Sequence, residues 1–129
     1  MGDEFAHFDG ARVRYRDSGG AGPVVLMTHG IGESLEFWHR QFDALGASLR
    51  LIAWDMPGHG LSDERADAVD LAGQAAVAWK LLDQLGVGRV HLVGNSLGAA
   101  MSLRMAAQTP GRVGSLLLAN SAALGAEVF

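Results

Sequence analysis

The sequence predicts an α/β fold with three layers: a mostly parallel sheet of about six strands between helices, preceded by an N-terminal antiparallel hairpin. Short, continuous apolar runs recur along the chain and are typical of strands buried on both faces. Stretches with apolar residues at helical spacing lie between these runs. Near the start, an Asp-Gly pair separates two alternating stretches, which favours a hairpin.

The hairpin is expected around Asp9-Gly10. Phe5 and His7 precede this pair, and Val13 and Tyr15 follow it, each with polar neighbours. Asp-Gly at this place favours a tight turn, because glycine accepts the positive φ that such turns need.

Strands and helices alternate along the rest of the chain. Buried strands are predicted for the apolar runs at 24–27, 51–54, 90–93 and 113–119. Helices are predicted at 37–49, 70–85 and 99–108, where apolar residues recur at helical spacing. Gly86 and Pro110-Gly111 follow the last two helices and are typical helix stops. This alternation predicts parallel pairing, because each helix crosses back over the sheet.

The composition indicates one globular domain over residues 1–129. Hydrophobic residues make up 49% and charged residues 19%, which excludes a wholly disordered chain. The net charge is -4 without a basic block, so we expect no nucleic-acid partner. Cysteine is absent, which excludes disulfides and cysteine-bound zinc, and we expect no metal and no cofactor. The acidic stretch from Met1 to Gly10 has no apolar region, so we expect no signal peptide there. No apolar run has the length needed to cross a membrane, and we therefore predict a cytoplasmic protein.

The sharpest chemical motif is Gly94-x-Ser96-x-Gly98, which lies between a predicted strand and a predicted helix. A nucleophilic serine needs a sharp strand-to-helix turn, and the residues two before and two after it must be small. The backbone amide of Leu97 would then face a developing negative charge from the start of a helix. We predict that Ser96 is a nucleophile; the alternative is a glycine-rich turn with a solvated serine.

A second motif, His29-Gly30-Ile31-Gly32, follows the predicted strand at 24–27. A loop here can direct a backbone amide, which we predict to be that of Ile31, at the same oxyanion. We expect the His29 ring to fix the loop by hydrogen bonds; a general base is the alternative.

A third motif, Asp55-x-x-Gly58-x-Gly60-x-Ser62, follows the predicted strand at 51–54. Its two glycines supply positive φ, and we expect Asp55 to hold the turn. A catalytic pair of Asp55 and His59 is the alternative.

These three motifs, in this order, resemble the α/β-hydrolase fold family over nearly the whole chain. The segment VGSLLLANSAAL at 113–124 resembles a subgroup with 3-oxoadipate enol-lactonases and small esterases. The resemblance implies hydrolysis of a small ester, lactone or thioester through an acyl-Ser96 intermediate, with oxyanion-hole amides from Ile31 and Leu97. Haloalkane dehalogenases are disfavoured because they carry Asp at the place of Ser96. Structural support is expected from His29, Gly30, Gly32, Asp55, Gly58, Gly60, Gly94 and Gly98.

The chain departs from the family in its length. Members generally run to about twice this length, and in them an Asp or Glu and then a His follow the nucleophile. No histidine follows His91 here, and Asn120-Ser121 stands where some members carry the acid. We therefore expect the N-terminal part of a hydrolase core, without the cap and the last strands. Its activity should be impaired or depend on another chain.

This departure also predicts a partner. The strand at 113–119 would be an exposed apolar edge beside an uncovered sheet face. We expect a homodimer or a complementing fragment to bind there, in addition to a small-molecule ester or lactone substrate.

Two other function classes stay open. The first is a non-catalytic fragment or binding scaffold that has the fold without the chemistry. The second is a nucleotide-binding βαβ unit, since Gly30-x-Gly32 follows a strand and Asp55 ends the next one. Leu35 at the third glycine position argues against this second class, because close helix packing there favours Gly or Ala.

Overall fold

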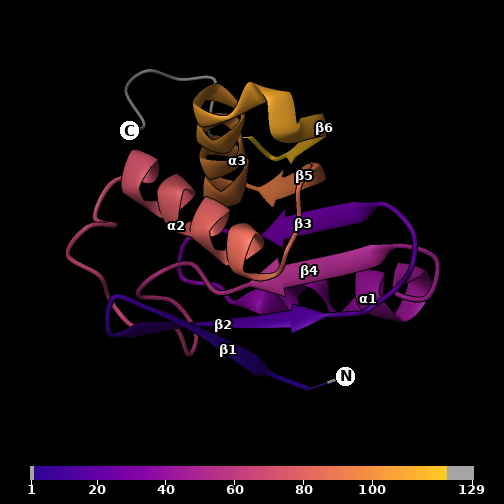
Figure 1. Cartoon of the computed structure of the whole chain (residues 1–129), viewed down its shortest axis with the longest axis horizontal. Helices are drawn as coiled ribbons and strands as arrows, with labels where there is room; N and C mark the ends of the chain where they lie inside the picture. The colour runs from indigo at the N-terminus through magenta and orange to yellow at the C-terminus, as the bar shows by residue number, and fades with distance from the viewer. Residues whose placement is uncertain (1, 122–129) are drawn as a thin grey trace.

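A computed structural model describes residues 2–121 of the chain. These residues form a six-stranded sheet in the order β1-β2-β4-β3-β5-β6 (Figure 1). The strands are β1 (Glu4–Phe8), β2 (Ala11–Asp17), β3 (Val24–Thr28), β4 (Arg50–Trp54), β5 (Val90–Asn95) and β6 (Val113–Ala119). The helices are η1 (Leu35–Trp38), α1 (His39–Leu45), α2 (Leu71–Gln84), α3 (Leu97–Gln108) and η2 (Pro110–Arg112).

Strand pairing confirms the predicted sheet. β1 and β2 pair antiparallel, and so do β2 and β4. The pairs β4-β3, β3-β5 and β5-β6 are parallel. The predicted hairpin turn lies between β1 and β2, where Asp9 and Gly10 have φ angles of 54° and 80°. Two positive φ angles are the signature of a tight turn whose twist matches that of the strands.

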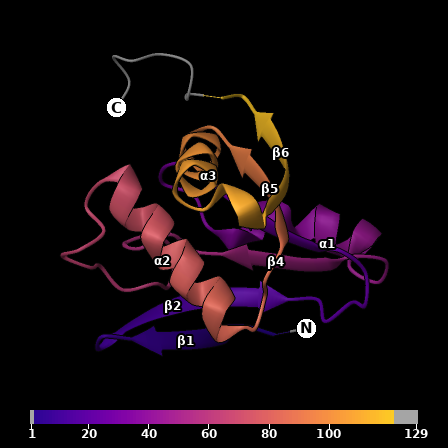
Figure 2. The same cartoon turned by 45° about the horizontal axis from the view of Figure 1, so that its top comes forward.

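The sheet lies between two layers of helix. α2 and α3 cover one face, and η1 and α1 cover the other (Figures 1 and 2). The register explains the two cores, because neighbouring side chains of a strand point to opposite faces. Leu26 and Ile52 pair and join the core beneath α2 and α3, whereas Met27 and Ala53 join that beneath η1 and α1.

Element boundaries differ from the prediction at two places. The predicted helix at 37–49 is a 3-10 turn followed by a short α-helix that ends at Leu45. Gly46 follows at once, and glycine is unfavourable within a helix, so the chain turns toward β4 there. The predicted helix at 99–108 begins earlier, at Leu97, because the chain passes from β5 into α3 through Ser96 alone.

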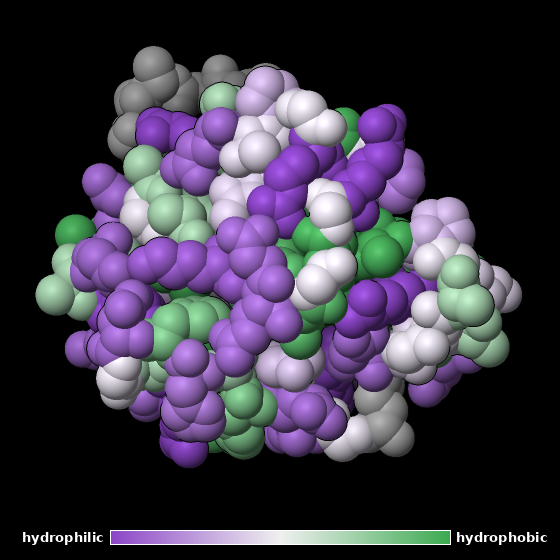
Figure 3. Space-filling view, viewed as in Figure 1, coloured by the Kyte–Doolittle hydropathy of each residue, from purple (hydrophilic) through white to green (hydrophobic). Residues whose placement is uncertain are grey.

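β6 forms one edge of the described sheet. Its Leu116 and Leu117 are 38% and 58% exposed, on opposite faces of the strand. The face that carries α2 and α3 is largely hydrophilic, with a hydrophobic area near the middle of the view (Figure 3). Among residues 2–121, no helix has the length and apolar character required to cross a membrane. The segment with subgroup resemblance continues to residue 124, and its last three residues lie outside the described part.

Candidate active site

Ser96 stands at the turn between β5 and α3 with a strained backbone. Its φ and ψ are 56° and -115°, outside the ordinary regions for an L-residue. A non-glycine residue in such a conformation costs on the order of 1–3 kcal/mol and is typical of functional sites. Its amide donates to the carbonyl oxygen of Ala119 at 2.9 Å, so β6 helps to hold the turn. The Ser96 hydroxyl forms no hydrogen bond with any other residue of the described chain.

The two glycines of the motif lie where a side chain has no room. A Cβ atom on Gly94 would be 2.6 Å from the nitrogen of Ala99. A Cβ atom on Gly98 would be 2.5 Å from the carbonyl oxygen of His29 and even closer to that of Thr28. Real Cβ atoms do not approach backbone this closely, so glycine at both positions lets α3 start directly against β5 and β3.

The loop after β3 lies against Ser96. A Cβ atom built on Gly30 would be 3.4 Å from the Cβ atom of Ser96. Ile31 and Leu97, whose amides we predicted for the oxyanion hole, line one pocket of about 430 Å³. Neither backbone amide donates to another residue within 2–121. The structure thus brings together the first two sequence motifs.

Glu33 holds this loop, although none of the three sequence motifs includes it. Its Oε1 atom accepts the Gly30 amide at 2.8 Å, and its own amide donates to the Gly30 carbonyl at 3.2 Å. Gly32 within this turn has a φ of 73°. The two hydrogen bonds close the turn that carries the Ile31 amide. Only the short distance in sequence between Gly30 and Glu33 could have pointed to this contact.

Both ring nitrogens of His29 are engaged. Nδ1 lies 2.6 Å from the Gly30 carbonyl oxygen, and Nε2 accepts the Met56 amide at 3.0 Å. These partners assign the proton to Nδ1. The side chain is fully buried, and this burial lowers the pKa of His29 below 6.5. The neutral ring therefore ties the loop after β3 to the end of β4, and no nitrogen is left to take a proton from Ser96.

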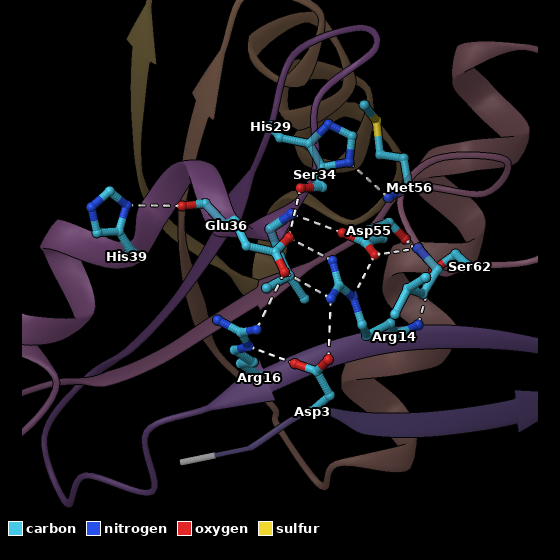
Figure 4. A network of polar contacts seen from close by, with 12 residues as sticks. Asp3, Arg14, Arg16, His29, Ser34, Glu36, His39, Asp55, Met56 and Ser62 are labelled. Carbon is cyan, nitrogen blue, oxygen red and sulfur yellow. Dashed lines mark hydrogen bonds and ion pairs between the residues drawn. The ribbon is translucent and has the colours of Figure 1, made fainter.

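Asp55 is buried and surrounded by donors (Figure 4). Its carboxylate accepts the amides of Leu35 and Leu61 at 2.7 and 2.8 Å and the Nε atom of Arg14 at 2.6 Å. Ser62 donates its hydroxyl to the Asp55 carbonyl oxygen at 2.8 Å. Both carboxylate oxygens of Asp55 are thus engaged within the protein. The carboxylate is not available to bind a ribose, which argues against the nucleotide-binding alternative.

Glycines complete the turn after Asp55. Gly58 and Gly60 have φ angles of 77° and 51°, as the motif predicts. A Cβ atom on Gly60 would overlap the Asp55 carboxylate. No hydrogen bond joins Asp55 and His59 in the described chain; the Nδ1 atom of His59 lies 3.2 Å from the Pro57 carbonyl oxygen instead.

Arg14 extends this network to the surface. Its guanidinium also binds Glu36 at 2.6 Å and Asp3 at 3.1 Å, which joins the hairpin to η1. The hydrogen bonds from Arg14 lower the pKa of Glu36 to about 2. Arg14 could not be predicted as a buried residue, because nothing in its local sequence distinguishes a buried arginine from an exposed one on a hairpin.

The chain is similar to known proteins over most of its length. Residues 23–128 match the family described as alpha/beta hydrolase fold. The chain belongs to this family. It is 36% identical over 125 residues to the dihydrolipoyllysine-residue acetyltransferase component of an acetoin cleaving system from Cupriavidus necator, covering 97% of this chain and 33% of that protein.

Hydrolases are among the relatives of this alpha/beta hydrolase chain. A 2-hydroxy-6-oxononadienedioate/2-hydroxy-6-oxononatrienedioate hydrolase from Burkholderia vietnamiensis is 38% identical over 125 residues, covering 92% of this chain and 43% of that protein. The crystal structure of a hydrolase from Pseudomonas aeruginosa superimposes with a TM-score of 0.87 at 35% identity, covering 96% of this chain and 48% of that chain. The chain thus spans a third to a half of the length of these relatives.

The nucleophile of this hydrolase fold has no hydrogen-bonded base among residues 2–121. No histidine or carboxylate side chain within residues 2–121 hydrogen-bonds to the Ser96 hydroxyl. Asn120, at the position that suits an acid in some family members, donates to the Oδ1 atom of Asn95 at 3.0 Å. Across the same residues, no cluster of His, Cys, Asp or Glu side chains would bind a metal ion.

Proposed function

We propose that this chain supplies the nucleophile and the oxyanion hole of a serine hydrolase that cleaves a carboxylic ester, lactone or thioester. The positive φ of Ser96, at the sharp passage from β5 to α3, carries the proposal. The loop that carries Ile31 approaches this turn, since a Cβ atom on Gly30 would lie 3.4 Å from the Cβ atom of Ser96, and this supports an oxyanion hole made by the Ile31 and Leu97 amides.

The chemistry follows from these positions. The Ser96 oxygen attacks the substrate carbonyl carbon, and the negative charge on the carbonyl oxygen is stabilised by the Ile31 and Leu97 amides. The leaving group departs with a proton and an acyl-Ser96 ester remains. Water then attacks this ester, releasing the acid and restoring the hydroxyl.

The hydroxyl needs a base that takes its proton, since a serine is a weak nucleophile without one. We propose that the base and its orienting acid come from polypeptide outside residues 2–121. Both ring nitrogens of His29 and all of the Asp55 carboxylate are already engaged, which supports an outside source. The greater length of the relatives supports it as well.

A fluorophosphonate probe tests the nucleophile, because it forms a covalent bond with an activated serine. We expect slow labelling of the chain that is accelerated by imidazole, which can act as an external base. Ser96→Ala should abolish the slow labelling and its acceleration by imidazole. Ser115→Ala, at an exposed serine of β6, should label like the unchanged chain. Labelling that persists in Ser96→Ala would contradict the proposal. No labelling, even with imidazole, would favour a non-catalytic scaffold.

We also propose that the edge at β6 pairs with a second copy when the chain is alone. Val93 and Leu117 line an apolar hollow of about 510 Å³ beside α1, at the edge where Leu117 is 58% exposed. An exposed apolar edge strand offers unpaired backbone groups to another strand. Sedimentation at micromolar concentration should show a dimer, and Leu117→Lys should shift it to monomer. Leu61→Lys, at an exposed turn, is the control, and a monomeric unchanged chain would contradict the proposal.

A further inference from the structure

Arg104 lies in the pocket that Ile31 and Leu97 share. This pocket of about 430 Å³ is lined by Ile31, His59, Val69, Asp70, Leu71, Gln74, Leu97 and Arg104. Its apolar members can surround the hydrocarbon part of an acyl group, and Arg104 is its one arginine. The pocket therefore connects the proposed oxyanion hole to a cation.

The geometry of α3 sets the direction from Leu97 to Arg104. Leu97 and Arg104 are seven residues apart on α3, which is two turns, so they lie on the same face. Their Cα atoms are therefore separated by roughly 10 Å along the helix axis. The Cα–Cβ bonds of a helix tilt toward its N-terminus, so the Arg104 side chain starts out toward the end of α3 that carries Ser96. A short acyl chain could span the remaining gap.

Arg104 is free to bind an anion. Six other arginines form ion pairs with Asp or Glu: Arg12, Arg14, Arg16, Arg50, Arg65 and Arg112. Within residues 2–121 Arg104 forms none. The one carboxylate of the pocket, Asp70, accepts the Gly73 amide at 2.8 Å and caps α2. Asp70 forms no ion pair with Arg104.

We propose that Arg104 determines specificity by binding a carboxylate on the acyl part of the substrate. The preferred substrates are then monoesters of short dicarboxylic acids, in which the free carboxylate lies a few carbon atoms beyond the scissile carbonyl. A guanidinium binds a carboxylate with two parallel hydrogen bonds, which also fixes the direction of the acyl chain. This inference rests on the proposed serine hydrolase, because it takes Ser96 as the place of attack.

The role of Arg104 is tested by measuring ester binding in a variant that cannot turn the ester over. In the Ser96→Ala background, monomethyl glutarate and the neutral ester methyl butyrate are titrated by calorimetry or by NMR. We expect the anionic ester to bind about tenfold or more tightly than the neutral one. Arg104→Gln should remove this preference and leave the neutral ester unaffected, and Arg104→Lys should restore part of it.

Arg40→Gln and Arg89→Gln are matched controls. Each removes the same charge from an exposed arginine that forms no ion pair with the described residues and does not line the pocket. Both should keep the preference for the anionic ester. Equal binding of the two esters, no binding of either, or a preference that survives in Arg104→Gln would overturn the proposal. Fluorophosphonate labelling of the chain with Ser96 intact reports separately on the hydrolase chemistry.

Discussion

The Nε atom of Arg14 lies 2.6 Å from the Oδ2 atom of Asp55, and both side chains are buried. This pair joins β2 to the end of β4, and the other contacts of Asp55 reach the start of η1 and the turn at Leu61. One carboxylate thus holds the segments that surround the loop at Gly30. Asp55 therefore supports segments next to this loop, although it takes no part in the proposed chemistry.

Arg14→Leu should strongly destabilise the fold. It leaves the Asp55 carboxylate buried without its counter-charge, which typically costs on the order of 3–5 kcal/mol. Arg12→Leu is the control on the same strand, because its ion pair with Asp63 is about half exposed and should contribute at most about 1 kcal/mol. Urea unfolding gives both values, and similar losses in the two variants would contradict this account of Asp55.

Gly98→Ala tests the close approach at the start of α3. The added Cβ atom would meet the carbonyl oxygens of Thr28 and His29, so α3 must shift away from β3. We expect a loss of about 1–3 kcal/mol on urea unfolding, together with slower fluorophosphonate labelling of Ser96. Gly88→Ala has open space around its Cβ position and should change neither measurement. Unchanged labelling and stability in Gly98→Ala would show that neither property needs the close approach of α3 to β3.

Much of the fold was predictable because its signals are local. The apolar runs, the Asp9-Gly10 turn and the glycines around Ser96 each specify backbone geometry within a few residues. Arg14 was not predictable, since its partners lie 22 and 41 residues away, in segments that only the folded sheet brings together. Arg104 was not predictable either, because it lines a pocket together with Ile31, and these two residues lie far apart in the sequence.

Glu33 is expected to act as a positioning residue. Glu33→Ala removes the acceptor of the Gly30 amide, so the turn that carries the Ile31 amide loosens. We expect about tenfold slower fluorophosphonate labelling, with little change in urea stability because the turn is on the surface. Glu33→Gln keeps a carbonyl acceptor and should restore most of the rate. Equal rates in Glu33→Ala and Glu33→Gln would contradict a role through this hydrogen bond.

Folding stability should decrease as pH falls below about 6.5, because of His29. Burial lowers the pKa of this ring in the folded protein, whereas in the unfolded chain it takes up a proton near its ordinary value of 6.5. Below that pH the unfolded chain therefore binds a proton that the folded protein does not. The free energy of unfolding falls until the folded pKa is reached.

The measurement is urea unfolding between pH 7.5 and about 5.5, a window chosen to separate His29 from Glu36. Glu36 has a lowered pKa of about 2, so its contribution is complete above 4.5 and is lost only at lower pH. His7→Gln, at an exposed position of β1, should leave the slope unchanged, whereas His29→Gln should reduce it. Should His29→Gln fail to fold, NMR of the unchanged chain should find the His29 ring still neutral below pH 6.5. Nε2 of His29 can accept the Met56 amide only while the ring is neutral. A His29 ring that takes up a proton at or above pH 6.5 in the folded protein would therefore contradict the prediction.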